Sequence, residues 1–483
     1  MIFSSVTFLF LFLPLVLAGS FFAGQRYRNH VLFAASLLFY LWGEGGYLLL
    51  LLFSILATFY LGRMLETSSG TRQKILLGLG VLVNLLPLFF FKYLHFTVEA
   101  LAPIFVFAGQ EPWQTGAIHL PAGISFFTFQ AISYLIDVYR RVVPAEQRIL
   151  NCGLYIAMFP QLIAGPIVRY HDIARQLVQR TVTSQGFALG AERFVFGLAK
   201  KVLLADPLGA KADQLFSLPL QELSTGDAWL GAICFTLQIY YDFSGYSDMA
   251  IGLGRMFGFT LPENFRYPYI SRSMREFWRR WHISLSTWLR DYLYIPLGGS
   301  RNGLPHTLAN LLIVFLLCGL WHGANWTFVV WGLWHGLFLV LERLVPLQQN
   351  SVLRQGLGWL YTTVVVIIGW VIFRSPSMEF AFQYCQVMAG KPEVLNSSFL
   401  LTLTADTMLL SQLIGGIILA LPVYGLLRQR AAEILQQRVP ASTFPATVGS
   451  LSFIRLILFA SLLYAVLITI AAQAYHPFLY FQF

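Results

Sequence analysis

The sequence predicts an all-α polytopic membrane protein, and three observations support this prediction. Of the 483 residues, 57% are hydrophobic and 11% are charged, whereas an ordinary soluble domain carries about 25% charged residues. Too few polar residues remain to coat a soluble protein of this length, so lipid must contact much of the surface. The apolar residues gather in runs, many of them close to the roughly 20 residues that a transmembrane helix needs. No soluble domain, linker or low-complexity tract interrupts these runs, which indicates a single membrane-embedded domain over residues 1–483.

The apolar runs extend along the whole chain, at 4–23, 30–42, 46–62, 75–91, 97–108, 122–139, 150–168, 187–205, 227–258, 307–321, 325–342, 357–373, 408–427 and 451–473. Several are too short to cross a bilayer about 30 Å thick. We expect those to be re-entrant or interfacial helices, which must lie within protein or line a cavity. The prediction is roughly 10 to 12 true spans with one or two re-entrant elements.

The first run, Val6 to Ala23, is predicted to be a retained helix and not a cleaved signal peptide. No charged side chain precedes it, and the first basic residues, Arg26 and Arg28, follow it. A cleaved signal has the opposite polarity. Basic residues concentrate in cytoplasmic loops, so the N-terminus is expected outside the cytoplasm.

Further basic loops orient the rest of the chain. Those expected in the cytoplasm contain Arg63, Arg72 and Lys74, and later Arg428, Arg430 and Arg438. Arg455 lies near the start of the last apolar run, so that helix is expected to begin inside and to leave the C-terminus outside. Both termini are therefore predicted to be extracytoplasmic, and the polar stretch 389–406 is expected to be an outside loop.

The formal net charge of +10 fits the same positive-inside distribution. Without a basic tail or a recognisable binding fold, we expect no nucleic-acid partner. The cysteines lack the spacing of metal ligands, so we expect packing residues and no metal site. They are Cys152, Cys234, Cys318 and Cys385.

His322, within Trp-His-Gly-Ala-Asn-Trp at 321–326, is the first candidate for chemistry. Ionisable side chains inside a membrane are costly and tend to mark function. Histidine is the usual general base near neutral pH because its reference pKa is about 6.5, and Gly323 allows another group to approach closely. A structural histidine in a helix bundle is the competing interpretation. His335, in a second Gly-Leu-Trp-His-Gly, meets the same description, so local chemistry does not choose between them.

Residues 274–292 combine tryptophan and arginine in a helical pattern. The residues that share one face are Trp278, Trp281, Leu285 and Trp288. The arginines are Arg275, Arg279, Arg280 and Arg290. Two compatible interpretations are an interfacial helix anchored by these residues and a site for an anionic cofactor, since arginine pairs well with phosphate.

Two further segments carry polar or aromatic residues. Asp242 and Asp248 interrupt a long apolar run; they indicate either a structural hydrogen-bonded knot at a helix break or a proton relay of a transporter. By composition, the aromatic C-terminal residues 476–483 are typical of a membrane-boundary belt.

In this order, the segments resemble the membrane-bound O-acyltransferase superfamily. The closest likeness is to the branch that serves O-acetylation of alginate, peptidoglycan and cellulose, which is related to the acyltransferase of teichoic-acid D-alanylation. The likeness covers almost the whole chain and rests on residues 3–5, 8–14, 120–130, 159–166, 241–248, 277–282 and 321–326. It implies a ring of tilted helices around a thinned centre in the bacterial inner membrane, with a central tunnel leading from the cytoplasm.

The resemblance assigns roles to individual residues. The family's catalytic histidine falls on His322, because Ala324-Asn325-Trp326 matches as well, and a second polar position falls on His282. Acetyl-CoA is the implied acyl donor, used as a substrate and not as a tightly bound cofactor. Its phosphates are expected near the cluster of Arg275, Arg279, Arg280, Trp281 and Arg290.

The tail, residues 474–483, resembles the C-terminal aromatic motif of the small acyl-carrying partner in the D-alanylation system. The resemblance implies that this motif is fused to the enzyme, with Tyr480 as a transient acyl carrier. The chemistry fits: the pKa of a phenol is about 10 and that of a thiol about 8.5, so a tyrosyl ester keeps most of the transfer potential of a thioester.

The expected function is transfer of acetyl across the membrane for O-acetylation of an extracytoplasmic polysaccharide, with alginate as first choice. Expected partners are a soluble extracytoplasmic acetyltransferase and the polysaccharide biosynthesis machinery. Peptidoglycan and cellulose remain open, because these motifs are shared. The rival classes are a transporter or flippase, which would explain Asp242 and Asp248, and a scaffold for a polysaccharide synthase. A lipid acyltransferase would lack the branch-specific ends of this chain.

Overall fold

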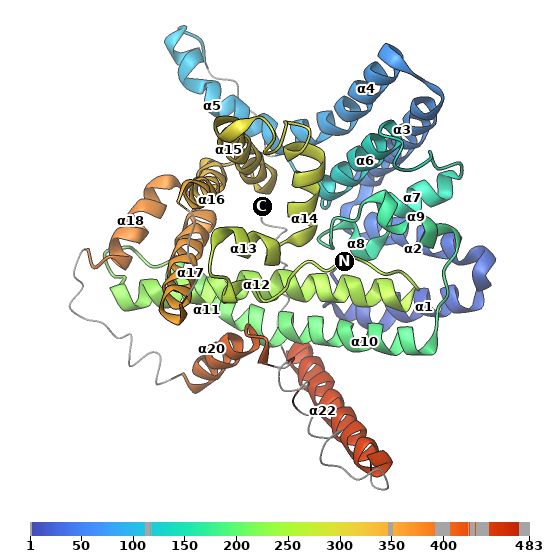
Figure 1. Ribbon diagram of the computed structural model, residues 1–483. Helices are drawn as coiled ribbons and strands as arrows, with labels where there is room; N and C mark the ends of the chain where they lie inside the picture. The colour runs from blue at the N-terminus through green and yellow to red at the C-terminus, as the bar shows by residue number, and fades with distance from the viewer. Residues whose placement is uncertain are drawn as a thin grey trace.

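The computed structural model describes residues 2–111, 116, 118–345, 351–391, 406–423, 425, 430 and 444–472 (Figure 1). The predictions for the tail 474–483 with Tyr480, for Arg428 and Arg438, and for most of the loop 389–406 therefore lie outside the described residues.

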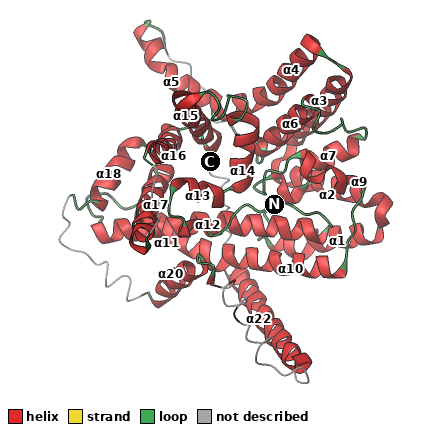
Figure 2. Ribbon diagram, in the orientation of Figure 1, coloured by secondary structure: helices red, strands yellow, loops and turns green. Residues whose placement is uncertain are grey.

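All regular elements in the described part of the chain are helices, which confirms the all-α prediction (Figure 2). The α-helices are α1 (Leu13–Phe22), α2 (Gly24–Glu44), α3 (Leu48–Thr67), α4 (Gly70–Leu88), α5 (Leu94–Phe107), α6 (Ile124–Tyr139), α7 (Ile149–Ala157), α8 (Phe159–Leu162), α9 (Tyr170–Val178), α10 (Ser184–Ala199), α11 (Asp206–Phe216), α12 (Thr225–Met256), α13 (Met274–Arg280), α14 (Ile283–Leu289), α15 (Gly303–His322), α16 (Trp326–Leu344), α17 (Val352–Arg374), α18 (Met378–Met388), α20 (Thr407–Leu419) and α22 (Phe444–Ala472). Shorter helical segments are η1 (Phe8–Phe12), η2 (Gly45–Tyr47), η3 (Phe89–Tyr93), η4 (Lys200–Ala205), η5 (Pro268–Ile270) and η6 (Arg290–Tyr294).

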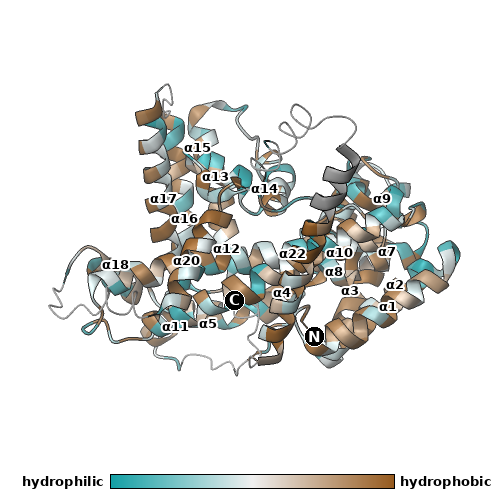
Figure 3. Ribbon diagram, turned by 90° about the horizontal axis from the view of Figure 1, so that it is seen from below, coloured by the Kyte–Doolittle hydropathy of each residue, from teal (hydrophilic) through white to brown (hydrophobic). Residues whose placement is uncertain are grey.

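Six helical stretches among the described residues are long and apolar enough to cross a membrane: Gly24–Thr67, Gly70–Phe107, Gly303–His322, Trp326–Leu344, Val352–Arg374 and Phe453–Ala472. The first two each contain more than one helix, and three shorter apolar helices add to the set. The protein is thus a multi-pass membrane protein, while the number of 10 to 12 spans stays a prediction. Hydrophobic residues cover most of the long helices, and hydrophilic residues gather around α9, α13 and α14 (Figure 3).

The longest helix, α12, runs beside α10 across the molecule (Figure 1). Two glycine pairs, spaced seven residues apart on each helix, lie at this contact. A Cβ on Gly190 would lie 2.6 Å from the carbonyl oxygen of Gly252, and a Cβ on Gly197 would lie 2.5 Å from that of Gly245. Small residues let membrane helices pack backbone to backbone, so these positions must stay glycine for α10 to touch α12.

The predicted helix break around Asp242 and Asp248 is wrong, because α12 is continuous from Thr225 to Met256. The carboxylates are accommodated by ion pairs to the neighbouring segment. Lys201 pairs with Asp242 at 2.8 Å, and Lys200 pairs with Asp248 at 2.6 Å. Paired charges can lie inside an unbroken helical bundle because each carboxylate is compensated by a nearby cation.

The repeated Gly-Leu-Trp-His-Gly has a structural explanation at the crossing of α15 and α16. Gly319 and Gly332, the first residue of each copy, face each other, and a Cβ on either would overlap a carbonyl oxygen of the opposite helix. The repeat therefore places His322 and His335 at equivalent distances along the two helices, three residues after the contact.

Candidate active site

His322 is the last residue of α15 and is 6% exposed. Its ring lies 4.9 Å from the ring of Trp331 and 5.5 Å from that of Phe373, measured between centroids. The backbone is extended at Gly323, where a Cβ would overlap the ring of Phe328. Only glycine can follow His322 here, and this turn holds the imidazole at a helix end inside the protein.

His282 lies beside His322 although the two are far apart in the sequence, with ring centroids separated by 6.5 Å. His282 is fully buried between α13 and α14, and its φ of 42° places it in the left-handed region. Such a conformation in a residue other than glycine costs about 1–3 kcal/mol and often occurs at functional sites. Its Nδ1 lies 3.2 Å from the side-chain oxygen of Asn264, which also accepts a hydrogen bond from the Ser284 hydroxyl.

Asn264 was not predicted from the sequence, because a lone asparagine in a loop has no distinctive local pattern. Asn264 can contact His282 only because the loop before α13 folds back against the start of α14. Its backbone carbonyl accepts from the Ile283 amide at 3.0 Å. Asn264 therefore fixes both the backbone and the ring of His282.

His335, the competing histidine, lies in an aromatic cage. Its ring is 4.8 Å from that of Trp331 and 5.3 Å from that of Trp278. His335 is fully buried and lines neither of the two cavities that lead toward His322. The structure therefore distinguishes the two histidines: His322 lines a cavity, whereas His335 lines neither of these two. The chemistry of the local sequence alone did not distinguish them.

The first cavity, which we call the histidine cavity, has a volume of about 210 Å³. Its lining consists of Glu44, Lys92, residues 119–126, Ile163, Trp321 and His322. His119 is largely exposed and bonds Glu44 at 3.0 Å, so this pair marks the mouth. His322 lies at the opposite, buried end.

The second cavity, which we call the arginine cavity, has a volume of about 200 Å³. It is lined by Arg275, Trp278, Arg279, Ser286, Leu289, Arg290, Tyr294, Leu311, Val314, Phe315, Cys318 and Leu339. Cys318 lies one turn before His322 on α15, so the inner wall of this cavity approaches the histidine. The Trp278 indole N–H is buried and has no hydrogen-bond partner among the described residues.

Three of the five residues predicted to bind the cofactor line the arginine cavity, namely Arg275, Arg279 and Arg290. The other two lie elsewhere. Arg280 pairs with Glu276 at 2.9 Å. Trp281 is 2% exposed and packs in the aromatic core, because α13 ends just before it. Its ring is therefore inside the bundle and not on the arginine face.

The two cavities lie toward opposite ends of the helical bundle. Glu44, at the mouth of the histidine cavity, precedes α3, while Glu66 lies at the far end of that 20-residue helix, about 30 Å away. Glu66 accepts from the Ala145 amide in the loop after α6. At the end of α6, Arg140 donates to the backbone carbonyl of Asp291, beside the arginine cavity. His322 lines the histidine cavity, and Cys318, one turn earlier on α15, lines the arginine cavity.

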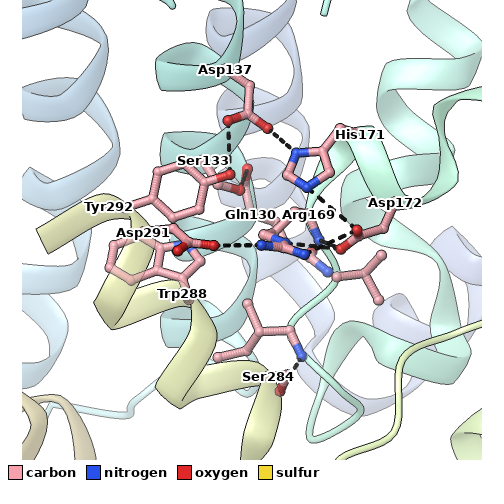
Figure 4. A network of polar contacts seen from close by, with 12 residues as sticks. Gln130, Ser133, Asp137, Arg169, His171, Asp172, Ser284, Trp288, Asp291 and Tyr292 are labelled. Carbon is pink, nitrogen blue, oxygen red and sulfur yellow. Dashed lines mark hydrogen bonds and ion pairs between the residues drawn. The ribbon is translucent and has the colours of Figure 1, made fainter. Parts of the chain in front are cut away.

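A polar network fixes the wall of the arginine cavity (Figure 4). Arg169 donates to Asp291 at 2.7 Å and to Asp172 at 3.0 Å. His171 bonds Asp137 at 2.7 Å, and Asp137 also accepts from the Tyr292 hydroxyl at 2.8 Å. Since Asp291 and Tyr292 belong to η6, the network holds the segment of Arg290 against α6 and α9. No local pattern in the sequence predicts this network, because its members come from separate segments of the chain.

The hydrogen bond to Asp137 raises the pKa of His171 above its usual value. A raised folded-state pKa means that protonated His171 stabilises the fold below the unfolded pKa of about 6.5, and that this contribution is lost as pH rises through the folded pKa. We expect the thermal unfolding midpoint to fall by about 1–3 °C across that range. His171→Gln should remove this part of the pH dependence; an unchanged slope in the variant would contradict the assignment.

The sequence is similar to a protein family and to several known proteins. A family model for the membrane-bound O-acyltransferase family matches residues 35–382. The chain is 44% identical over 496 residues to the probable alginate O-acetylase AlgI of Pseudomonas putida, and 42% identical over 510 residues to that of Azotobacter vinelandii, with all of both chains covered in each case. It is also 35% identical over 427 residues to the peptidoglycan O-acetyltransferase of Helicobacter pylori, covering 81% of this chain and 80% of the relative.

Proposed function

Because this chain belongs to the membrane-bound O-acyltransferase family, we propose that it transfers acetyl from acetyl-CoA to an acceptor hydroxyl for O-acetylation of an extracytoplasmic polysaccharide. The observation that carries the proposal is the position of His322, which lines the histidine cavity and lies one turn of α15 from Cys318 in the lining of the arginine cavity. In this proposal acetyl-CoA approaches His322 through the arginine cavity and the acceptor approaches it through the histidine cavity. Neither molecule then has to cross the membrane.

The arginine cavity suits the donor. Guanidinium groups bind phosphate through paired hydrogen bonds, and Arg275, Arg279 and Arg290 lie together on its lining. Deeper in, the lining is apolar except for groups such as the unpartnered indole N–H of Trp278, which can donate to an amide carbonyl of the pantetheine arm. An arm that follows this cavity ends beside Cys318, one turn from His322.

His322 is the proposed general base. It removes the proton of the acceptor hydroxyl while the hydroxyl oxygen attacks the acetyl carbonyl carbon, and it returns that proton to the departing thiolate. His282, whose Nδ1 lies 3.2 Å from the Asn264 side-chain oxygen, is the second polar residue beside His322, with ring centroids 6.5 Å apart. The acceptor enters from the histidine cavity.

The immediate acceptor is proposed to be the Tyr480 hydroxyl in the tail, which passes the acetyl group to a separate soluble extracytoplasmic transferase. In this proposal both termini lie outside the cytoplasm, and the chain spans the bacterial inner membrane. Alginate is the first choice of polymer, because two relatives matched over their full length are named probable alginate O-acetylases; peptidoglycan is the alternative, from the Helicobacter pylori relative.

Acyl transfer by purified protein separates this proposal from a transporter or flippase. Detergent-purified protein given acetyl-CoA should release free CoA, and the release should depend on the proposed acceptor, the Tyr480 hydroxyl. A transporter would move acetyl units without breaking the thioester. The pairing of Asp242 and Asp248 with lysines gives both carboxylates a structural role that needs no proton relay.

The arginine cavity yields a specific prediction. Replacing Arg279 by Gln removes a charged donor for phosphate and should raise the KM for acetyl-CoA about tenfold, since a tenfold change corresponds to about 1.4 kcal/mol. The kcat should change little, because the arginine lies away from His322. Steady-state kinetics of CoA release measures both.

Arg280→Gln is the matched control, because Arg280 lies on the same helix but is paired with Glu276 and does not line the cavity. An equal rise of KM in both variants would indicate a general effect of charge at this face and would contradict a dedicated site.

A further inference from the structure

Lys92 is a charged residue in the middle of the apolar helical stretch Gly70–Phe107. A lysine at such a position is costly and, when retained, marks a functional site by default. Its Nζ donates to the carbonyl oxygens of Trp321 at 2.6 Å and His322 at 3.1 Å. The ammonium therefore binds the C-terminal end of α15, where free carbonyls and the helix dipole concentrate negative charge.

Binding a helix end does not by itself account for a charge at this position. Tyr93, the next residue, donates to the carbonyl oxygen of Leu320 at 2.7 Å and so caps the same helix with a neutral hydroxyl. Lys92 differs because it lines the histidine cavity together with His322. Glu44, the acidic residue of that lining, is bonded to His119 at the mouth.

No carboxylate among the described residues lies within 4.0 Å of the Lys92 ammonium. Its partners are neutral oxygens, and the longest contact, 3.4 Å to the Ser125 hydroxyl, is the weakest. A substrate oxygen could replace that contact without disturbing the two bonds to α15. Among the described residues, the cavity thus holds a lysine without a carboxylate partner, apart from Glu44 at the mouth, and one loosely held N–H that lines the cavity together with His322.

We propose that Lys92 is a catalytic residue whose ammonium stabilises the negative charge on the acyl carbonyl oxygen during transfer. The inference rests on the proposed function. When the acceptor oxygen bonds to the carbonyl carbon, its proton goes to His322 and the π electrons of the carbonyl move onto oxygen. The carbonyl then re-forms, the bond from carbon to sulfur breaks, and the thiolate takes the proton from His322. Lys92 stays protonated throughout.

A fixed donor aimed at this oxygen in a site shielded from water contributes strongly, since loss of one such donor typically lowers kcat about 10²- to 10³-fold. Lys92→Gln keeps N–H groups that can reach the carbonyls of α15 but removes the charge. We expect kcat to fall about 10²-fold or more, the KM for acetyl-CoA to stay within about threefold, and Lys92→Arg to retain more activity than Lys92→Gln.

Tyr93→Phe is the matched control, because it removes a hydrogen bond to the same helix end without changing the charge of the cavity. It should keep kcat within about threefold of the original. The measurement is the rate of CoA release by purified full-length protein, with acetyl-CoA affinity and the thermal midpoint recorded for every variant. If Lys92→Gln does not fold, Lys92→Met, which keeps the side-chain length, replaces it.

The proposal is overturned if an uncharged variant keeps the original kcat, or if Tyr93→Phe loses as much as Lys92→Gln, which would reduce Lys92 to a helix cap. A loss of kcat that is matched by a loss of acetyl-CoA affinity would overturn it as well. If the unaltered protein itself transfers no acetyl group, the proposed function fails instead, so the two failures are distinguishable.

Discussion

Replacing His322 by Gln is expected to lower acetyl transfer by about 10²- to 10⁴-fold, because a positioned general base contributes about that factor and His322 is the buried histidine among the described residues that line the histidine cavity. His282 is the nearest candidate, but its ring centroid is 6.5 Å from that of His322 and its Nδ1 is engaged with Asn264. Affinity for acetyl-CoA should persist, since the arginine cavity is formed by other residues.

His335→Gln is the control for this experiment. It changes a fully buried histidine at the equivalent position of α16 that lines neither cavity. We expect that variant to keep substantial activity, with a lower thermal midpoint because the aromatic cage loses a ring. Measured rates in the reverse order, with His335→Gln inactive and His322→Gln active, would sink the assignment of the base.

Replacing Tyr480 by Phe in the full chain is expected to reduce polymer acetylation to background. Only the phenol hydroxyl is removed, so a carrier role would be abolished while the aromatic ring is kept. Hydrolysis of acetyl-CoA by water in the site should continue at a low rate, because His322 is untouched. Intact-mass analysis after incubation with acetyl-CoA reports the acetylated tail directly.

Tyr464→Phe is the matched control, as Tyr464 is an exposed tyrosine on α22, within the apolar stretch Phe453–Ala472. The Tyr464→Phe variant should show the same extent of tail acetylation and of polymer acetylation as the original protein. Tail acetylation of unchanged extent in Tyr480→Phe would rule out this tyrosine as the carrier.

Some of the site could be predicted from local sequence. His322 stands out because an imidazole at the end of an apolar run, followed by glycine, is chemically conspicuous. The arginines of 274–292 stand out by their number, yet only those on one face of α13 and at the start of η6 line a cavity. Arg280 and Trp281 share the motif but point elsewhere, since α13 ends and the chain turns at His282.

Lys92 and Asn264 could not be predicted, for a different reason. Each is a single polar residue in an ordinary local context, and its importance comes from partners elsewhere in the chain. The partner of Lys92 is more than 200 residues away, and that of Asn264 is 18 residues away. The ion pairs of Asp242 and Asp248 likewise depend on α10 and η4 lying against α12. No periodicity within one segment contains that information.

The sequence by itself determined that this is a helical, multi-pass membrane protein and which histidines are candidates for chemistry. Both follow from composition and from the energetic cost of polar groups in lipid, which are properties of each segment taken alone. Only the tertiary structure decided which histidine faces a cavity, which arginines gather at a second one, and that a lysine lies beside the base. Those facts depend on how helices cross, and at α15 and α16 the crossing is set by two glycines whose backbones touch.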